Sequence, residues 1–180
     1  MFSKQTIVTL DLEGVLAPEI WIAVAEKTGI ADLRLTTGDI PDYDVLMQGR
    51  LKILERENIT LSTIQKIIAD LGLLEGAKDF LDTLRDETQV IIPSDTFQEF
   101  AYPTMKNLAL PTIFCHNLIV ENDKIVSYQL RMQDQKTKVV NALRALNYNV
   151  FSAGDSFNDT GMLLAAHKGV FFNAPESIEK

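Results

Sequence analysis

Short apolar runs of strand length alternate along this chain with segments that have the apolar spacing of helices, and this alternation limits the fold more than any other feature. Several of the runs are rich in β-branched residues, as buried strands often are. Alternation of this kind predicts an α/β fold, in which a Rossmann-like parallel sheet is flanked by helices on both faces. The expected strands cover residues 7–10, 90–92, 112–114, 150–153 and 170–172.

A stretch early in the chain departs from the alternation, because it holds three helical patterns and no convincing strand. The first expected helix has Pro18 near its start and Gly29 just past its end, which is the usual asymmetry of helix termini. The second covers about residues 43–57. The third begins around Ser62, with Gln65 three residues later as the partner in a candidate capping box. The stretch therefore predicts a small helical insertion.

The insertion divides the chain into two predicted units joined by short linkers. An α/β core would consist of residues 1–16 and 76–180, and a helical cap of residues 17–75. Within the core, the turn-forming residues 121–124 separate two strand-like runs. This pattern predicts a hairpin at one edge of the sheet.

The composition supports one compact fold of this kind and excludes several classes of partner. The 180 residues are 46% hydrophobic, which is enough to fill one buried core. Because 17 Lys and Arg stand against 25 Asp and Glu, the net charge of −8 offers no general attraction to nucleic acid or to an anionic membrane surface. No apolar stretch approaches the length needed to cross a bilayer, and the N-terminus does not read as a secretory signal. The single cysteine, Cys115, cannot form an intramolecular disulfide, so we expect a cytoplasmic protein.

Polar side chains follow three of the expected strands, where the ligands of open α/β sheets bind. A lysine also opens the helix that precedes the fourth strand. Because parallel strands end at the same edge of a sheet, these side chains can converge on one crevice. They are Asp11 and Glu13 after the first strand, Ser94 and Asp95 after the second, Asp155, Asn158 and Asp159 after the fourth, and the lysine Lys136.

The carboxylates in this set predict a site for Mg²⁺ and a phosphate group. Asp155 and Asp159 are four residues apart at a helix start, so both can present oxygens toward one point. Gly14 permits the turn that would bring Asp11 and Glu13 to the same place. Hard oxygen ligands suit Mg²⁺, which usually binds one or two carboxylates together with water and substrate phosphate. In an acidic protein, the metal, a lysine and helix N-termini would supply the positive field that a phosphate needs.

Such a site predicts phosphoryl transfer in two steps. Asp11 would attack phosphorus and form an aspartyl-phosphate, which splits one difficult displacement into two easier ones. Glu13 would protonate the leaving oxygen and then deprotonate the incoming one. Ser94 and Lys136 would bind the phosphate. Taken singly, an aspartate or serine after a strand is more often a turn or helix cap, so the prediction depends on their convergence.

These segments resemble the four motifs of the haloacid dehalogenase superfamily of phosphotransferases. The motifs are Asp11-Leu12-Glu13-Gly14-Val15, the serine Ser94 after the second strand, the lysine Lys136, and Gly154-Asp155-Ser156-Phe157-Asn158-Asp159. Within this superfamily the chain resembles the phosphoserine phosphatase branch, and most of all its members that also transfer phosphate to homoserine. That narrower resemblance rests on longer strings, among them residues 18–23, 39–47 and 94–97.

The resemblance implies the haloacid dehalogenase fold and a Mg²⁺-dependent phosphoserine phosphatase of serine biosynthesis. Asp11 would be the phosphorylated nucleophile and Glu13 the acid and base. Asp11, the Glu13 carbonyl and Asp155 would form the Mg²⁺ shell, which Asp159 would support. The acceptor of the phosphoryl group would be water or homoserine. A homodimer is a further expectation.

The resemblance also implies contacts to the phosphoryl group. Ser94 and Lys136 would hold its oxygens, Asn158 would lie beside it, and Asp95 would lie next to the substrate. Lys138 is only two residues after Lys136, so it remains a competing choice for the lysine. Pro93 removes one backbone donor directly before the serine, which would change the phosphate geometry there.

Two residues of the insertion match the family's ligands for the amino-acid part of the substrate. Glu19 would bind the ammonium group, and Arg50 would bind the carboxylate, for which a guanidinium fork is well suited. Each has an alternative explanation. Glu19 could complement the dipole of the first helix, and Arg50 could lie on a solvated helix face.

Two other functions are compatible with parts of this pattern. A signalling receiver domain also uses a strand-end aspartate, Mg²⁺, a hydroxyl and a lysine, but it has neither a helical insertion after the aspartate nor an internal base such as Glu13. A catalytically silent binding protein on the same scaffold would bind Mg²⁺ or phosphoserine without releasing phosphate. The complete set of motif residues favours the enzyme.

Overall fold

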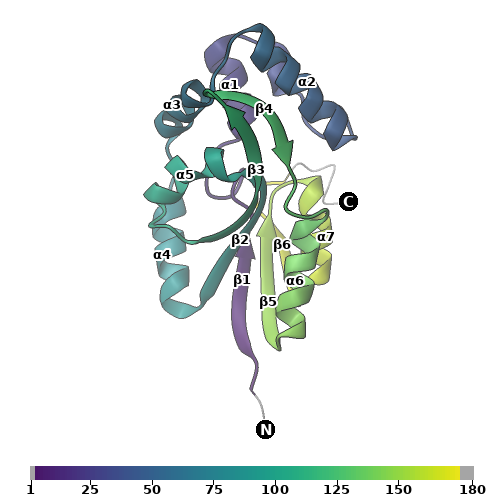
Figure 1. The fold of residues 1–180 in the computed structure, drawn as a ribbon. Helices are drawn as coiled ribbons and strands as arrows, with labels where there is room; N and C mark the ends of the chain where they lie inside the picture. Colours follow the sequence, from purple (N-terminus) through teal and green to yellow (C-terminus); the bar gives the residue numbers. More distant parts are fainter. Residues whose placement is uncertain (1–2, 175–180) are drawn as a thin grey trace.

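The fold is a six-stranded mixed sheet with helices on both faces (Figure 1). The computed structural model describes residues 3–174 of the chain. The strands are β1 (Gln5–Leu10), β2 (Gln89–Phe97), β3 (Thr112–Glu121), β4 (Lys124–Gln129), β5 (Tyr148–Gly154) and β6 (Lys168–Phe171). They lie in the order β4-β3-β2-β1-β5-β6, and every neighbouring pair is parallel except β3 and β4. The predicted α/β sheet is therefore confirmed, with one antiparallel strand at its edge.

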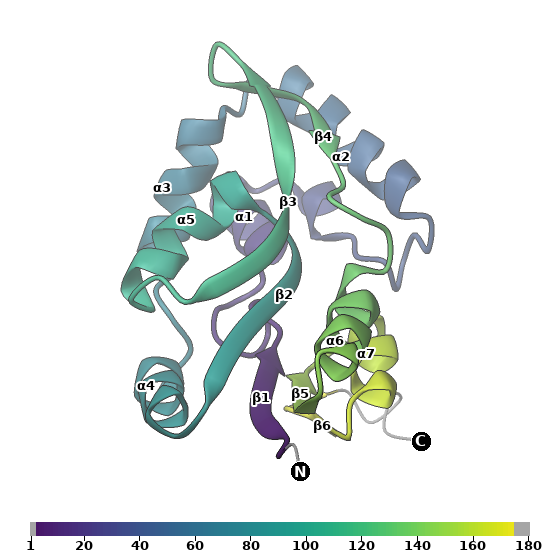
Figure 2. The ribbon, with the colours of Figure 1, turned by 60° about the horizontal axis from the view of Figure 1, so that its bottom comes forward.

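Two pairs of helices cover the faces of the sheet. They are α4 (Ala77–Glu87) and α5 (Gln98–Asn107) on one face, and α6 (Gln135–Ala145) and α7 (Thr160–Ala165) on the other (Figure 2). Ile7 of β1 packs into the cluster with α6 and α7, whereas Val8 and Leu10 pack into the cluster with α4 and α5. Because side chains alternate along a strand, a central strand that is apolar at consecutive positions serves both layers.

The segment between β1 and α4 is helical, as the sequence predicts. It contains α1 (Ile20–Thr28), a 3-10 helix η1 (Ala31–Arg34), α2 (Tyr43–Arg56) and α3 (Leu61–Leu71). Its buried side chains, such as Leu54 and Ile64, share one apolar cluster with Leu118 of β3 and Ile125 of β4. The hairpin therefore packs directly against the inserted helices.

The capping box expected at the start of α3 is wrong. The N-cap is Thr60, whose side chain accepts a hydrogen bond from the backbone nitrogen of Thr63. Ser62 lies inside the helix, where its hydroxyl donates to Asp123, and the side chain of Gln65 donates to the backbone oxygen of Glu99. Both predicted partners therefore contact other elements instead of each other.

The β3–β4 hairpin is confirmed, and its turn is fixed to the inserted helices. Asn122 and Asp123 both have positive φ, as the tight turn between antiparallel strands requires. The Asp123 carboxylate accepts from the backbone nitrogen and the hydroxyl of Ser62, at 2.9 and 2.6 Å. The tip of the hairpin thus supplies hydrogen-bond acceptors to the first turn of α3.

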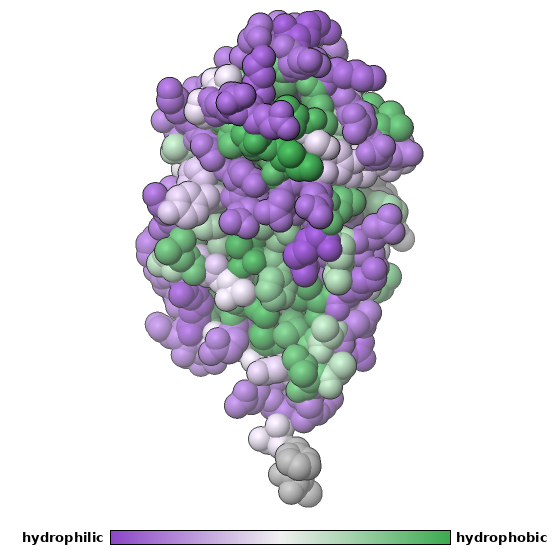
Figure 3. Space-filling view, viewed as in Figure 1, coloured by the Kyte–Doolittle hydropathy of each residue, from purple (hydrophilic) through white to green (hydrophobic). Residues whose placement is uncertain are grey.

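The exposed surface separates polar helices from a more apolar sheet region. Figure 3 shows polar side chains over most of one face and apolar side chains gathered over the strands between α4 and α6. No helix within residues 3–174 combines the length and apolarity needed to cross a membrane.

Candidate active site

A cavity of about 370 Å³ lies at the carboxyl ends of the central strands, beneath the inserted helices. It brings together residues that the sequence spreads over the whole chain. Those of the predicted set that line it are Asp11, Glu13, Glu19, Arg50, Ser94, Asp95, Lys136 and Asn158. Asp155 and Asp159 lie beside this cavity, in a group with Asp11 whose ligand oxygens are within 4.8 Å of one another.

Lys136 is buried at the centre of the site. Its ammonium nitrogen lies 2.8 Å from Asp11 Oδ2 and 2.7 Å from Asp159 Oδ1, and 3.9 Å from Asp95 Oδ2. Burial by itself would lower the pKa of Lys136, but the Asp11 and Asp159 carboxylates outweigh burial and raise it, so the amine is protonated. Lys138, the competing choice, is exposed on the same helix.

Asp11 follows β1 and is 5% exposed. Its Oδ1 accepts from the backbone nitrogen of Leu12 at 2.8 Å, while its Oδ2 faces Lys136. Burial raises the pKa of Asp11 from 3.8 to about 7, against the opposing charge of Lys136. The carboxylate is therefore held in one orientation and is poorly solvated, which suits a nucleophile that must attack a bound group.

Asp155 and Asp159 differ in how many hydrogen bonds they already make. The Asp159 carboxylate is saturated, because Oδ1 contacts Lys136 and Oδ2 accepts from the backbone nitrogens of Asp155 and Ser156. Asp155 Oδ1 is buried, and no residue that the structure describes donates to it. A buried carboxylate oxygen without a donor fits a cation ligand, so these residues suit a metal held by Asp11 and Asp155, with Asp159 supporting the loop.

Two glycines make room for these acids. A Cβ atom on Gly14 would lie 2.0 Å from Asp155 Oδ2, and one on Gly154 would lie 2.3 Å from Asp159 Cγ. Gly14 also has a φ of +77°, a conformation that glycine adopts without strain. The turn that the sequence predicts at Gly14 is therefore present, and it lets the Asp155 side chain lie against the chain next to Glu13.

Glu13 points from this turn toward the start of α1. Its Oε2 accepts from the backbone nitrogen of Ile20 at 2.9 Å. Burial raises its pKa above the ordinary value, and the charge of Asp11 adds to the shift. A carboxyl group whose pKa is raised is protonated more readily, which suits a group that donates a proton and later takes one back.

Ser94 and Asp95 lie within β2, where its register with β3 shifts. Ser94 is buried, and its hydroxyl oxygen lies 3.4 Å from the backbone nitrogen of Thr96. Burial would raise the pKa of Asp95, but hydrogen bonding to His116 and the charge of Lys136 outweigh it and lower the pKa. Asp95 is therefore ionised, and its Oδ2 accepts from the side chain of Asn158 at 3.2 Å.

Arg50 and Glu19 face the cavity from the inserted helices. Arg50 is 7% exposed, with its guanidinium 4.4 Å from the centre of the Trp21 ring, so a solvated helix face is excluded. Its Nη2 donates to the backbone oxygen of Leu35 at 2.7 Å, while its Nε has no partner in the described part of the chain. Burial lowers the pKa of Arg50 to about 10, so the group is charged at neutral pH.

Glu19 is the N-cap residue of α1, but its side chain makes no capping hydrogen bond. Burial raises its pKa to about 8, and the neighbouring carboxylates of Glu13 and Asp155 contribute to the shift. The Glu19 side chain lines the cavity and does not cap the helix that it precedes.

Sequence reasoning missed a cluster of polar residues behind Ser94 and Asp95. Gln135 and His116 are buried there, and Arg131 contacts both of them. His116 is buried, and its ring nitrogens lie within hydrogen-bond distance of Arg131 and Gln135. No spacing rule could have found this cluster, because it forms only when β2, β3 and the start of α6 pack together.

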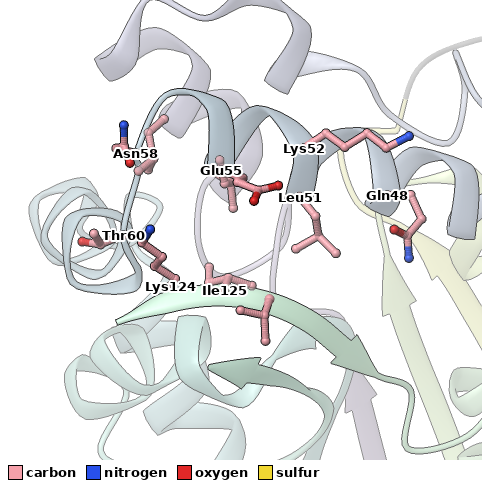
Figure 4. Close-up of a pocket in the computed structure, with 11 residues that line it drawn as sticks. Gln48, Leu51, Lys52, Glu55, Asn58, Thr60, Lys124 and Ile125 are labelled. Carbon is pink, nitrogen blue, oxygen red and sulfur yellow. The ribbon is translucent and has the colours of Figure 1, made fainter. Parts of the chain in front are cut away.

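A second cavity of about 280 Å³ lies between α2 and β4 (Figure 4). Leu51 and Ile125 form part of its apolar surface, and Lys52, Asn58 and Lys124 lie around it. It shares no lining residue with the first cavity, and it holds none of the residues that the sequence predicts to be functional.

No family model matches the chain. The chain is 56% identical over 173 residues to phosphoserine phosphatase ThrH of Pseudomonas aeruginosa, covering 96% of this chain and 84% of that protein. It is also 56% identical over 173 residues to a phosphoserine phosphatase of Pseudomonas syringae pv. tomato, covering 96% of this chain and 73% of that protein.

Solved structures share the fold at much lower sequence identity. An apo phosphoserine phosphatase matches with a TM-score of 0.81 at 18% identity, covering 98% of this chain and 90% of that one. A phospho-aspartyl intermediate analogue of phosphoserine phosphatase matches with a TM-score of 0.80 at 18% identity, over the same shares of the two chains. These structures establish the similarity of the fold.

Proposed function

Because the chain belongs to the phosphoserine phosphatase branch of the haloacid dehalogenase superfamily, we propose that it hydrolyses phosphoserine through an aspartyl-phosphate on Asp11. The observation that carries the proposal is the buried contact of 2.8 Å between Asp11 and Lys136 at the end of β1, beside an Asp155 oxygen to which none of residues 3–174 donates. The two phosphoserine phosphatases that are 56% identical over almost the whole chain support the choice of substrate.

The reaction would proceed in two displacements at phosphorus. In the first, a carboxylate oxygen of Asp11 attacks phosphorus, the bond to the serine oxygen breaks, and Glu13 gives that oxygen a proton. In the second, Glu13 takes a proton from water, the water oxygen attacks phosphorus, and the bond to Asp11 breaks. Inorganic phosphate leaves, and both carboxyl groups return to their starting states.

Asp11, Asp155 and the backbone oxygen of Glu13 would hold Mg²⁺, with Asp159 keeping the loop in place. Mg²⁺ at this position would neutralise part of the negative charge that the phosphate and the carboxylates bring together. All of these ligand atoms are oxygens, and Mg²⁺ prefers oxygen ligands to softer ones.

Lys136, Ser94 and Asn158 would bind the phosphoryl oxygens. Lys136 supplies a permanent charge, and Ser94 supplies a hydroxyl at the end of β2. Electrostatic stabilisation of this kind dominates phosphoryl transfer, because charge spreads over the transferred oxygens. Asp95 would orient Asn158, because the Asn158 side-chain nitrogen donates to the Asp95 carboxylate at 3.2 Å.

The helical segment 17–75 would act as a cap over the core formed by residues 1–16 and 76–180. Glu19 would bind the substrate ammonium and Arg50 its carboxylate. The buried and incompletely paired guanidinium of Arg50 supports this role, because a carboxylate would satisfy it.

Homoserine is a second acceptor that the same site would take. It carries the ammonium and carboxylate of serine, so Glu19 and Arg50 would bind it once serine has left. Its hydroxyl would then replace water in the second displacement and give phosphohomoserine. The motif resemblance supports this proposal.

The test is phosphate release from a panel of phosphomonoesters, with and without Mg²⁺. We expect phosphoserine to be the preferred substrate in the presence of Mg²⁺, and phosphohomoserine to appear when homoserine is added. A phosphorylated protein that persists for hours without turnover would favour a receiver-like signalling domain. Binding of phosphoserine without phosphate release would favour a silent binding protein.

A further inference from the structure

The polar contacts around Gln135 form a buried network that the proposed mechanism does not use. Gln135 is the first residue of α6, directly before Lys136, and it is 1% exposed. Its amide nitrogen donates to the backbone oxygen of Ser94 at 2.6 Å. Its amide oxygen accepts from Nε and Nη2 of Arg131, at 3.2 and 2.9 Å. A carbonyl only accepts and a guanidinium only donates, so these contacts fix which way the amide points.

Ser94 requires such a partner because the main chain of β2 leaves the sheet ladder at this point. The pairing of β2 with β1 ends at Ile91, and its register with β3 shifts between Pro93 and Phe97. Neither neighbouring strand is therefore in register with Ser94, which is 2% exposed. A buried carbonyl group needs a hydrogen-bond donor, and the Gln135 amide takes the place of a strand.

A second set of contacts surrounds the same amide. The backbone nitrogen of Arg131 donates to His116 Nδ1 at 3.0 Å, and His116 Nε2 lies 3.2 Å from the amide nitrogen of Gln135. Asp95 Oδ1 lies 3.6 Å from that Nε2 and 3.3 Å from the amide nitrogen of Gln135. Asp95 Oδ2 in turn accepts from Asn158. The network thus reaches from β3 to the loop after β5.

We propose that Gln135 is a positioning residue that sets the spacing between Ser94 and Lys136, the two groups assigned to the phosphate. This inference rests on the proposed function. Lys136 follows Gln135 in the chain, and Ser94 is hydrogen-bonded to the Gln135 amide, so one side chain joins the end of β2 to the start of α6. The two phosphate ligands come from different elements, β2 and α6, and the Gln135 side chain adds a direct hydrogen bond between them. A misplacement of about 1 Å in such a site can cost about 10²-fold in rate.

Two substitutions separate the contacts of Gln135. Gln135→Met removes all polar contacts of the side chain at similar volume, whereas Gln135→Glu keeps an acceptor for Arg131 and removes the donor to Ser94 and Asp95. We expect each to lower kcat for phosphoserine by about 10–100-fold and to weaken inhibition by inorganic phosphate, at a temperature where the variant is folded. Lys138→Met, an exposed change on the same helix, is the matched control and should leave both values unchanged.

A purely structural role for Gln135 would lower the thermal midpoint but leave kcat and phosphate affinity of the folded protein as they are, and that result would overturn the proposal. Gln135→Glu covers the case in which Gln135→Met does not fold, because its carboxylate can pair with Arg131. A wild-type protein that does not turn over phosphoserine would contradict the proposed function instead. Calorimetric titration with inorganic phosphate then decides: weaker binding by the variants supports the positioning role, and equal or absent binding throughout rejects it.

Discussion

The charged groups on the two walls of the active-site cavity are paired to different extents. On the wall formed by the sheet, the Lys136 ammonium contacts two carboxylates at 2.7 and 2.8 Å, and Asp159 uses both of its oxygens. On the wall formed by the inserted helices, Arg50 Nε has no partner within residues 3–174, and burial and nearby carboxylates raise the pKa of Glu19 to about 8.

This difference indicates what each wall is built to do. The groups of the sheet wall are oriented before substrate arrives, as a site that stabilises developing charge must be. The groups of the helical wall are buried at a cost that only a ligand of matching charge would recover. We therefore expect changes in the sheet wall to lower kcat and changes in the helical wall to raise KM.

The largest effect is expected from Asp11→Asn in the sheet wall. The amide keeps the shape of the side chain but cannot form the aspartyl-phosphate, so phosphoserine turnover should fall by at least about 10³-fold. Steady-state phosphate release measures the loss. Asp86→Asn, the same change at an exposed position of α4, should leave the rate unaltered. Equal rates for Asp11→Asn and the wild type would refute the assignment of the nucleophile.

Arg50→Met should have the next largest effect, and it should depend on the substrate. The loss of a charge-assisted contact to the substrate carboxylate is expected to raise KM for phosphoserine by about 10–100-fold, with a smaller change in kcat. Phosphoethanolamine lacks the carboxylate, so its hydrolysis should be almost unaffected by the substitution. A similar rise in KM for both substrates would show that Arg50 supports the fold and does not bind the substrate carboxylate.

Glu19→Gln provides the reciprocal comparison and a smaller change, because the amide can still accept a hydrogen bond. We expect KM to rise by about 10-fold for phosphoserine and for phosphoethanolamine, which both carry an ammonium group. Phosphoglycolate has a carboxylate and no ammonium, and Glu19→Gln should hydrolyse it at least as well as the wild type does. The assignment of Glu19 to the ammonium group is wrong if turnover of phosphoglycolate falls as much as turnover of phosphoserine and phosphoethanolamine.

The smallest effect should appear in the stability of the metal-free protein. Because the folded-state pKa values of Asp11 and Glu19, about 7 and about 8, are above the ordinary 3.8 and 4.5, the folded state binds more protons than the unfolded state between these values. Stability should therefore fall as pH rises from about 5 to about 8, which lowers the thermal midpoint. Added Mg²⁺ at the upper pH should restore the midpoint. A midpoint that stays level or rises with pH would contradict the pKa shifts.

Sequence patterns predicted most of the fold because they depend on local periodicity. The strands, the three inserted helices and the hairpin all follow from apolar spacing or turn residues, and each is present. Helix α5 was not predicted as an element, and it contains Pro103, which local rules disfavour. Its buried residues include Phe100 and Met105, which lie in the apolar core.

The candidate site divides in the same way. Residues that directly follow apolar runs, such as Asp11, Ser94 and Asp155, could be found because strand ends mark the binding edge of the sheet. Gln135 and His116 could not, since their role depends on contacts between separate elements: Gln135 contacts Ser94, 41 positions away, and His116, 19 positions away. The burial of Arg50 likewise could not be predicted, because the sequence does not decide which face of α2 is exposed to solvent.

The most direct test of the account is the detection of the covalent intermediate. The protein is mixed with phosphoserine and Mg²⁺, quenched in acid within the first turnovers, digested at low pH, and analysed by mass spectrometry. The account predicts one phosphorylated peptide, with the phosphoryl group on Asp11. Rapid phosphate release with no phosphorylated peptide, or with the label on another residue such as Ser94, would contradict it.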